Sequence, residues 1–163
     1  MAITESFSIS RLSEFPSFAP ALAEAHAREW GHLYAGWGRN AALAEFQMET
    51  GGSDLPVTWI AHHPSGSLLG SISLVLEDLP GHPGLNPWLA SLFVFPAFRD
   101  RGLGRILTQT TLDFLAEHRH PHAYLFTKDK VSFFSNFQFA FHAKTQAQGH
   151  EVTLMRWANP HIT

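Results

Sequence analysis

Residues 89–107 read LASLFVFPAFRDRGLGRIL and decide how the rest of the chain is organised. The segment Leu89 to Phe95 is a short apolar run, typical of a strand that is buried on both faces of a sheet. Pro96 ends this run. From Gly102 to about His118 apolar residues recur at three- and four-residue spacing, which predicts an amphipathic helix. The stretch therefore predicts a central strand, a short loop and a helix in direct succession.

Apolar and alternating segments on both sides of this unit predict a mixed α/β fold. We expect helices at about 21–33, 41–48 and 129–137, and strands at about 7–10, 57–61, 68–76, 122–127, 139–147 and 151–157. Asn40 is placed to cap the second helix, and Asp129 stands at the start of the last. The strand at 89–95 would then lie near the middle of the sheet.

Composition excludes several classes of protein. The chain has 163 residues, of which 45% are hydrophobic, so it can form a substantial core. A net charge of −3 argues against a nucleic acid or an anionic membrane as partner. Cysteine is absent, which excludes disulfides, thiolate nucleophiles and cysteine-containing metal sites. Without a signal-like N-terminus or an apolar run of roughly 20 residues, we expect a soluble cytoplasmic protein.

The loop before the central helix has the chemistry of an anion site. Glycines at 102 and 104 allow close backbone approach, and the first N–H groups of a helix bind anions. Three arginines, Arg99, Arg101 and Arg105, could add charge-assisted hydrogen bonds to a phosphate. The dinucleotide fingerprint is absent because Leu107 stands where its third glycine would be, and no Gly-Lys-Ser/Thr of a P-loop follows. The alternative is an ordinary helix start.

In these residues the sequence resembles the GCN5-related N-acetyltransferase (GNAT) superfamily. The matching stretch runs from Leu92 to Gly104 (LFVFPAFRDRGLG), in the superfamily pattern of an apolar strand, Val-x-Pro and Gln/Arg-x-x-Gly-x-Gly/Ala. The resemblance continues through residues 124–127, similar to the fifth strand, and 131–139, similar to the fourth helix. It implies one acetyltransferase-like domain over residues 1–163. Its mixed sheet would have about six to seven strands, splayed at the fourth and fifth, flanked by about four helices.

The resemblance also implies a function, which is direct transfer of an acetyl group from acetyl-CoA to a primary amine. Backbone N–H groups between Arg101 and Arg105 would hold the pyrophosphate, and the main chain of Phe93 and Val94 the pantetheine arm. The full set of implied cofactor-binding residues is Phe93, Val94, Arg99, Arg101, Gly102, Leu103, Gly104, Arg105, Thr127 and Phe134. The acceptor would be a small molecule or a peptide, and the protein a monomer or a homodimer, without nucleic acid, membrane or metal.

Two positions depart from the superfamily pattern. Phe134 stands where many relatives have the tyrosine that protonates the CoA thiolate, and Trp88 where many have a glutamate base. Phenylalanine has no proton to donate. We therefore consider Asp78, Glu29 and Ser91 as candidate catalytic residues, together with histidines such as His82 or a water molecule. Glu29 could equally be a surface acid paired with Arg28 or with solvent. A catalytically quiet acyl-CoA-binding regulatory module is the alternative function.

Histidines and aromatic residues allow two further interpretations. The run from His118 to His122 contains three histidines, but the helix-to-strand turn and Pro121 would splay their rings, so we expect no zinc site there. A metal-binding protein remains a third hypothesis. Trp30, Tyr34 and Trp37 follow the first helix and could pack in the core or line a site for an amine cation.

Overall fold

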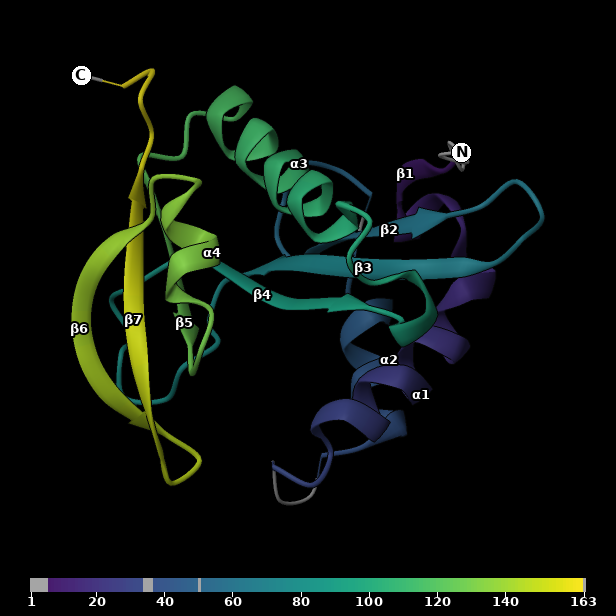
Figure 1. Ribbon diagram of the computed structural model, residues 1–163, viewed down its shortest axis with the longest axis horizontal. Helices are drawn as coiled ribbons and strands as arrows, with labels where there is room; N and C mark the ends of the chain where they lie inside the picture. Colours follow the sequence, from purple (N-terminus) through teal and green to yellow (C-terminus); the bar gives the residue numbers. More distant parts are fainter. Residues whose placement is uncertain (1–5, 34–36, 50, 163) are drawn as a thin grey trace. The chain divides into compact units, whose positions relative to one another are not determined.

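The computed structural model describes residues 6–33, 37–49 and 51–162 (Figure 1). These residues form seven strands, four α-helices and three short 3₁₀ helices. The strands are β1 Ser8–Arg11, β2 Val57–His62, β3 Leu68–Val75, β4 Trp88–Val94, β5 His122–Thr127, β6 Ala140–Ala147 and β7 His150–Ala158. The helices are α1 Ala19–Trp30, α2 Arg39–Gln47, α3 Leu103–Glu117 and α4 Val131–Ser135, with η1 Leu12–Glu14, η2 Pro16–Phe18 and η3 Pro96–Phe98.

The strands form one mixed sheet in the order β1-β2-β3-β4-β5-β7-β6, which confirms the predicted fold class. The β1–β2, β5–β7 and β6–β7 pairs are antiparallel. Strands β4 and β5 are parallel and pair at one register position, Trp88 opposite Tyr124. The predicted splay at these two strands is therefore present in the pairing itself, which stops at the first residue of β4.

The chain divides into two compact units, which we describe separately. The first contains the described residues of Met1–Ser73 and Ser91–Thr108. In it α1 and α2 lie side by side and pack on one face of the first strands (Figure 1). Leu22 of α1 and Ile60 of β2 are fully buried in the core between these layers, together with Leu12. Burial of this apolar face stabilises the unit.

The second unit contains Leu74–Ala90 and the described residues of Gln109–Thr163. Trp88 and Leu154 lie at the centre of its core, against Leu79 and Tyr124. Asn159 follows β7, and its side-chain amide donates a hydrogen bond of 3.0 Å to the His120 carbonyl. Among the described residues of both units, every helix is too short or too polar to span a lipid bilayer.

Three local predictions differ from the structure. Asn40 lies inside α2, because the helix begins at Arg39 with Gly38 as its N-cap. Helix α1 begins at Ala19, two residues before the expected start, and Pro20 falls in its first turn, where proline is tolerated since its missing N–H would have no helical partner. Helix α4 is shorter than expected and begins at Val131, two residues after Asp129. These differences move helix ends and leave the order of the elements unchanged.

Gly70 of β3 lies close to the backbone of β4. A Cβ atom at this position would sit 2.6 Å from the Phe93 carbonyl oxygen and 3.4 Å from Cδ1 of Leu107. Because backbone atoms cannot move aside cheaply, we expect Gly70→Ala to destabilise the fold by about 2 kcal/mol. Thermal unfolding should show a melting temperature lowered by roughly 4–8 °C. Gly84→Ala is the control, because a Cβ there meets nothing within 4 Å. Equal melting temperatures for the two variants would contradict this account.

Candidate functional site

Strand β4 is irregular at its centre. Ser91 has a backbone φ of 57°, in the left-handed region that non-glycine residues rarely adopt. Its side chain is exposed, although residues 88–90 are buried. A left-handed residue inside a strand is typical of a β-bulge, and bulges are common beside active sites because they redirect a side chain. At the candidate residue Ser91 the backbone therefore departs from the regular strand, and the side chain is exposed.

The loop that follows β4 curls tightly before α3. Arg99 donates a hydrogen bond of 2.8 Å from Nε to the Val94 carbonyl, which ties the loop back to the strand. Asp100 and Gly102 both have left-handed backbone conformations, with φ of 64° and 84°. Such alternation turns successive N–H groups toward one point and makes a concave anion site. Binding of an anion by this loop stays a prediction.

Backbone N–H groups and arginine side chains lie together at the start of α3. Helix α3 begins at Leu103, and the Ile106 N–H bonds to the Gly102 carbonyl at 3.2 Å. In the part of the chain that the structure describes, the N–H groups of Leu103 and Gly104 have no backbone acceptor, as expected for a first helical turn. The guanidinium of Arg101 lies 5.8 Å from the Phe98 ring centre, and Arg105 is exposed. This end of α3 can hold a phosphate.

Aromatic side chains gather where α1 contacts β4. The Phe93 ring packs edge-on against Trp30 at 5.9 Å and His26 at 6.0 Å, and Arg99 lies 5.7 Å from its centre. Trp30 is half-buried and makes ring contacts, and both interpretations of it, core packing and an amine site, stay predictions. The Trp37 indole donates to the Glu45 carboxylate at 3.1 Å. Tyr34, the third aromatic residue of that hypothesis, lies outside the described residues.

His26 and Ser71 form a buried polar pair beneath α1. Nε2 of His26 lies 3.0 Å from Oγ of Ser71, and both side chains are enclosed. Burial lowers the pKa of His26 to about 4, because desolvation disfavours the charged ring. At neutral pH the imidazole is therefore uncharged.

A carboxylate that the sequence did not indicate lies in the same unit. Glu49 follows α2. Both of its carboxylate oxygens are buried near Thr58, and among the described residues neither has a hydrogen-bond partner within bonding geometry. Burial raises the pKa of Glu49 to about 7, although Thr58 and the nearby charge of Arg11 act in the opposite direction. In sequence Glu49 is an ordinary polar residue at a helix end. Only its long-range contacts distinguish it.

The two carboxylates predicted to be catalytic, Glu29 and Asp78, belong to residues that are exposed or half-buried, whereas the carboxylate oxygens of Glu49 are buried. Glu29 is exposed on α1, and Arg28, its expected partner, pairs with Glu24 at 3.3 Å instead. Asp78 is half-buried in the loop after β3, in the other unit. In that loop His82 also lies 3.3 Å from the Thr145 hydroxyl. Burial thus singles out neither Asp78 nor Glu29 as a base.

Three residues of the second unit to which the sequence analysis drew attention make contacts that stabilise the fold. Trp88 is fully buried, and its indole N–H donates to the Leu85 carbonyl at 2.6 Å. The Thr127 hydroxyl accepts the Lys130 N–H at 3.0 Å and so holds the turn between β5 and α4. Phe134 is buried in α4 and packs edge-on against Phe133 and Phe139. Roles for Thr127 and Phe134 toward a cofactor stay predictions.

The histidine-rich turn has ordinary local contacts. The His118 ring packs on Phe114 with centres 4.3 Å apart, and the His120 carbonyl accepts the Asn159 amide. Burial, with a smaller effect of His118, lowers the pKa of His120. Within residues 6–33, 37–49 and 51–162, no group of three or more His, Cys, Asp or Glu is placed to hold a metal ion.

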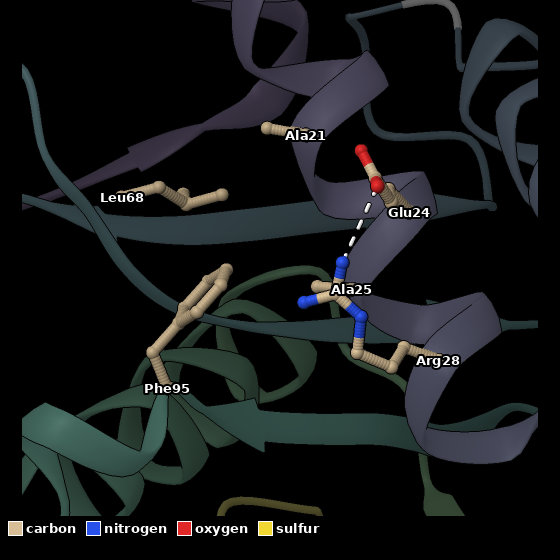
Figure 2. A pocket seen from close by; sticks show the side chains of 6 residues that line it. All are labelled: Ala21, Glu24, Ala25, Arg28, Leu68 and Phe95. Carbon is tan, nitrogen blue, oxygen red and sulfur yellow. Dashed lines mark hydrogen bonds and ion pairs between the residues drawn. The ribbon is translucent and has the colours of Figure 1, made fainter.

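An open pocket of about 250 Å³ lies along α1 in the first unit (Figure 2). Figure 2 shows Glu24 and Arg28 of α1 joined by their ion pair on one side, with Leu68 and Phe95 on the other. The remaining lining residues are Ala21 and Ala25. The residues predicted to bind the cofactor or to act in catalysis do not line this pocket, although its lining residue Phe95 packs against Phe93.

Comparisons with known proteins agree with the fold. The chain matches the acetyltransferase (GNAT) family over residues 19–136. A search of curated proteins found no match. Among solved structures, a protein assigned as an acetyltransferase from Acinetobacter baylyi is 12% identical with a TM-score of 0.77, and the alignment covers 100% of this chain and 98% of that one.

Two other solved structures add information about ligands and substrates of relatives. A protein assigned as an acetyltransferase from Salmonella typhimurium, solved with its cofactor acetyl-CoA, is 14% identical with a TM-score of 0.72 over 97% of this chain and 96% of that one. The ribosomal-protein-S18-alanine N-acetyltransferase from Escherichia coli is 15% identical with a TM-score of 0.65 over 94% of each chain. At these identities the likeness establishes the fold alone.

Proposed function

The chain belongs to the acetyltransferase (GNAT) family, and from this premise we propose that it transfers the acetyl group of acetyl-CoA to a primary amine. The observation that carries the proposal is the curled loop from Arg99 to Gly102, which leads into the first-turn N–H groups of Leu103 and Gly104 at the start of α3. A pyrophosphate needs such donors. A relative of the same fold was solved with acetyl-CoA, which supports the choice of cofactor.

We assign the cofactor to the residues that the family pattern marks. The N–H groups of residues 101–105 would bind the pyrophosphate, with charge from Arg99, Arg101 and Arg105. Phe93 and Val94 would contact the pantetheine arm, and Thr127 and Phe134 would lie near the thioester. Arg99 now holds the Val94 carbonyl. The second lone pair of that carbonyl oxygen could accept a hydrogen bond from the pantetheine arm.

In the proposed reaction the amine nitrogen attacks the thioester carbonyl while it loses a proton. The C–N bond forms, the C–S bond breaks, and the CoA thiolate leaves with the electron pair. Thiols titrate near 8.5, so the thiolate is a tolerable leaving group without a dedicated acid. An ammonium has no lone pair, so removing its proton is the demanding step. Asp78, Glu29, Ser91 or a water molecule are the candidates from sequence.

The acceptor would be a small molecule or a peptide amine. A relative named for acetylating an alanine of a ribosomal protein supports a peptide α-amine as one candidate. A net charge of −3 suits a cationic amine better than a nucleic acid or an anionic lipid, and a cytoplasmic location fits the absence of cysteine.

Turnover with a panel of amines tests the proposal directly. Purified protein, acetyl-CoA and each amine should give free thiol and a product 42 Da heavier, a mass difference set by the acetyl group. The alternative, a quiet acyl-CoA-binding module, is favoured by the apolar Trp88 and Phe134. It predicts thermal stabilisation by CoA with no acetylated product from any amine, and that result would reject the enzyme.

Proton donation by α4 should matter little to this enzyme. Phe134→Tyr restores the hydroxyl that many relatives have, and we expect turnover to change by less than roughly tenfold, below the usual range of a general acid. Turnover at saturating acetyl-CoA over a pH series measures this. Asp78→Asn and Glu29→Gln, measured in parallel, test the two carboxylates. If one of them is the base, its variant should lose more turnover than Phe134→Tyr does. A hundredfold gain from Phe134→Tyr would place the limiting proton transfer at the thiolate instead.

A further inference from the structure

The imidazole of His26 connects four elements of the first unit. This side chain of α1 is 3% exposed, and its Nε2 lies 3.0 Å from Oγ of Ser71, a fully buried residue of β3. The same ring packs edge-on against Phe46 of α2, with centres 5.4 Å apart, and against Phe93 of β4 at 6.0 Å. A single buried polar ring therefore contacts both helices and two neighbouring strands, and the reaction described above does not use it.

Stability alone does not require a polar pair at this place. Replacing both partners of a buried hydrogen bond by apolar groups of similar shape is often neutral for the free energy of unfolding, or even stabilising. What the bond between His26 and Ser71 supplies is orientation. The torsion that turns a flat ring about its bond to Cβ has a broad energy minimum, so packing by itself defines the ring plane loosely. A hydrogen bond from a ring nitrogen to a strand residue fixes that plane.

The ring of Phe93 is held by several groups, of which His26 is one. Trp30 packs against Phe93 at 5.9 Å and Phe95 does so at 5.0 Å, and the interplanar angle is 74° in these two contacts and in the contact with His26. The Arg99 guanidinium lies 5.7 Å from the Phe93 ring centre. Edge-to-face contacts depend on how the two rings are turned, so the plane of His26 bears on the position of Phe93. Burial lowers the pKa of His26 to about 4, so its ring is neutral and does not repel Arg99.

We propose that His26 is a positioning residue for the cofactor: with Ser71 it fixes the Phe93 ring, and through that ring the backbone of β4 that binds the pantetheine arm. The inference rests on the proposed acetyl transfer and on the assignment of Phe93 and Val94 to that arm. Because its side chain is enclosed, His26 acts only through Phe93. A backbone that is already held in its binding orientation loses less freedom when the cofactor binds, so the gain is in affinity for acetyl-CoA.

A double variant, His26→Phe with Ser71→Ala, removes both polar partners and keeps a ring at the position. We expect the dissociation constant of acetyl-CoA, measured by titration calorimetry, to rise by about 10-fold, the effect of losing one well-oriented aromatic contact. The KM for acetyl-CoA should rise with it, whereas kcat at saturating acetyl-CoA and the KM for the amine should stay at the parent values, since only cofactor binding is weakened. The melting temperature should stay close to that of the parent, because no polar group is left unpaired.

Thr58→Val with Ser73→Ala is the matched control. These two hydroxyls lie 2.7 Å apart and are buried between β2 and β3, so this variant removes another polar pair of the same unit and leaves His26 and Phe93 unchanged. It should bind acetyl-CoA as tightly as the parent. Ser71→Ala alone frees the His26 ring without replacing it. This single variant should weaken acetyl-CoA binding in the same direction, and it decides the question if the double variant fails to fold.

Three outcomes would contradict these assignments. Equal affinities for acetyl-CoA in the parent and in the folded His26 and Ser71 variants would overturn the positioning role. A loss of affinity that the control pair shares, or that appears only with a lowered melting temperature, would also overturn it, because His26 would then be an ordinary packing residue. A parent that binds no acetyl-CoA, or acetylates no amine, would instead overturn the proposed function.

Discussion

Gly104→Val should weaken acetyl-CoA binding by about 100-fold, which corresponds to roughly 2.7 kcal/mol of binding free energy. Gly104 lies in the first turn of α3, beside the N–H groups that we assign to the pyrophosphate. A branched side chain there would keep the phosphate oxygens away from these donors. The helix itself should be retained, because valine is a better helix former than glycine. Titration calorimetry with acetyl-CoA measures the loss.

The neighbouring glycine gives a different expectation. Gly102 has a φ of 84°, so any other residue there strains the loop as well as crowding the ligand. Gly104→Val is therefore the cleaner variant, and Gly84→Val, where a Cβ meets nothing within 4 Å, is its control. A folded Gly104→Val protein that binds acetyl-CoA as tightly as the parent would remove the cofactor from this site.

Trp88→Ala should destabilise the protein by about 3–5 kcal/mol, the usual range for deleting a large buried ring. Trp88 is 0% exposed, packs on Tyr124 with ring centres 5.8 Å apart, and satisfies its indole N–H on the Leu85 carbonyl. Trp88→Glu, which restores the acid of many relatives, should unfold the protein rather than activate it, because it buries an unpaired charge.

Chemical denaturation of the parent and the two variants measures these effects. Trp88→Phe is the control, since it keeps most of the buried area and loses only the hydrogen bond to Leu85. A Trp88→Ala protein within about 1 kcal/mol of the parent would contradict the packing role of Trp88. A folded and more active Trp88→Glu protein would show that an acid at this position can act in catalysis.

The elements that sequence predicted best are those with strong local signals. The strand at residues 122–127 was predicted to the residue, because an apolar run lies between polar ends. Helix α3, expected from 102 to about 118, extends from Leu103 to Glu117, since its apolar stripe has regular spacing. Helix ends were harder. Asn40 looks like an N-cap in sequence, but Gly38 occupies that position, and no local pattern distinguishes the two.

The residues of the candidate site likewise differ in how far the sequence could predict them. Residues 99–105 form a contiguous motif, so sequence could identify the loop before its curl was known. Glu49 and Thr58 come from separate parts of the chain and lie together only after folding. Their spacing in the sequence carries no signal. Ser91 lies between these cases, because it was singled out as a polar residue in the central strand, while its left-handed backbone became visible only in the structure.

Strands β4 and β5 pair at a single register position, so most of one side of β5 resembles the unpaired side of an edge strand. The Tyr124 N–H is held by the Pro87 carbonyl at 3.0 Å, while the other side of β5 is paired with β7 along its whole length. Phe126, two residues further on, directs its N–H to the same side as Tyr124, beyond the last register position with β4. Unpaired strand backbone is a template for other extended chains. Among the described residues β5 has no register position with β4 beyond Tyr124, so this side of β5 could pair with an extended chain.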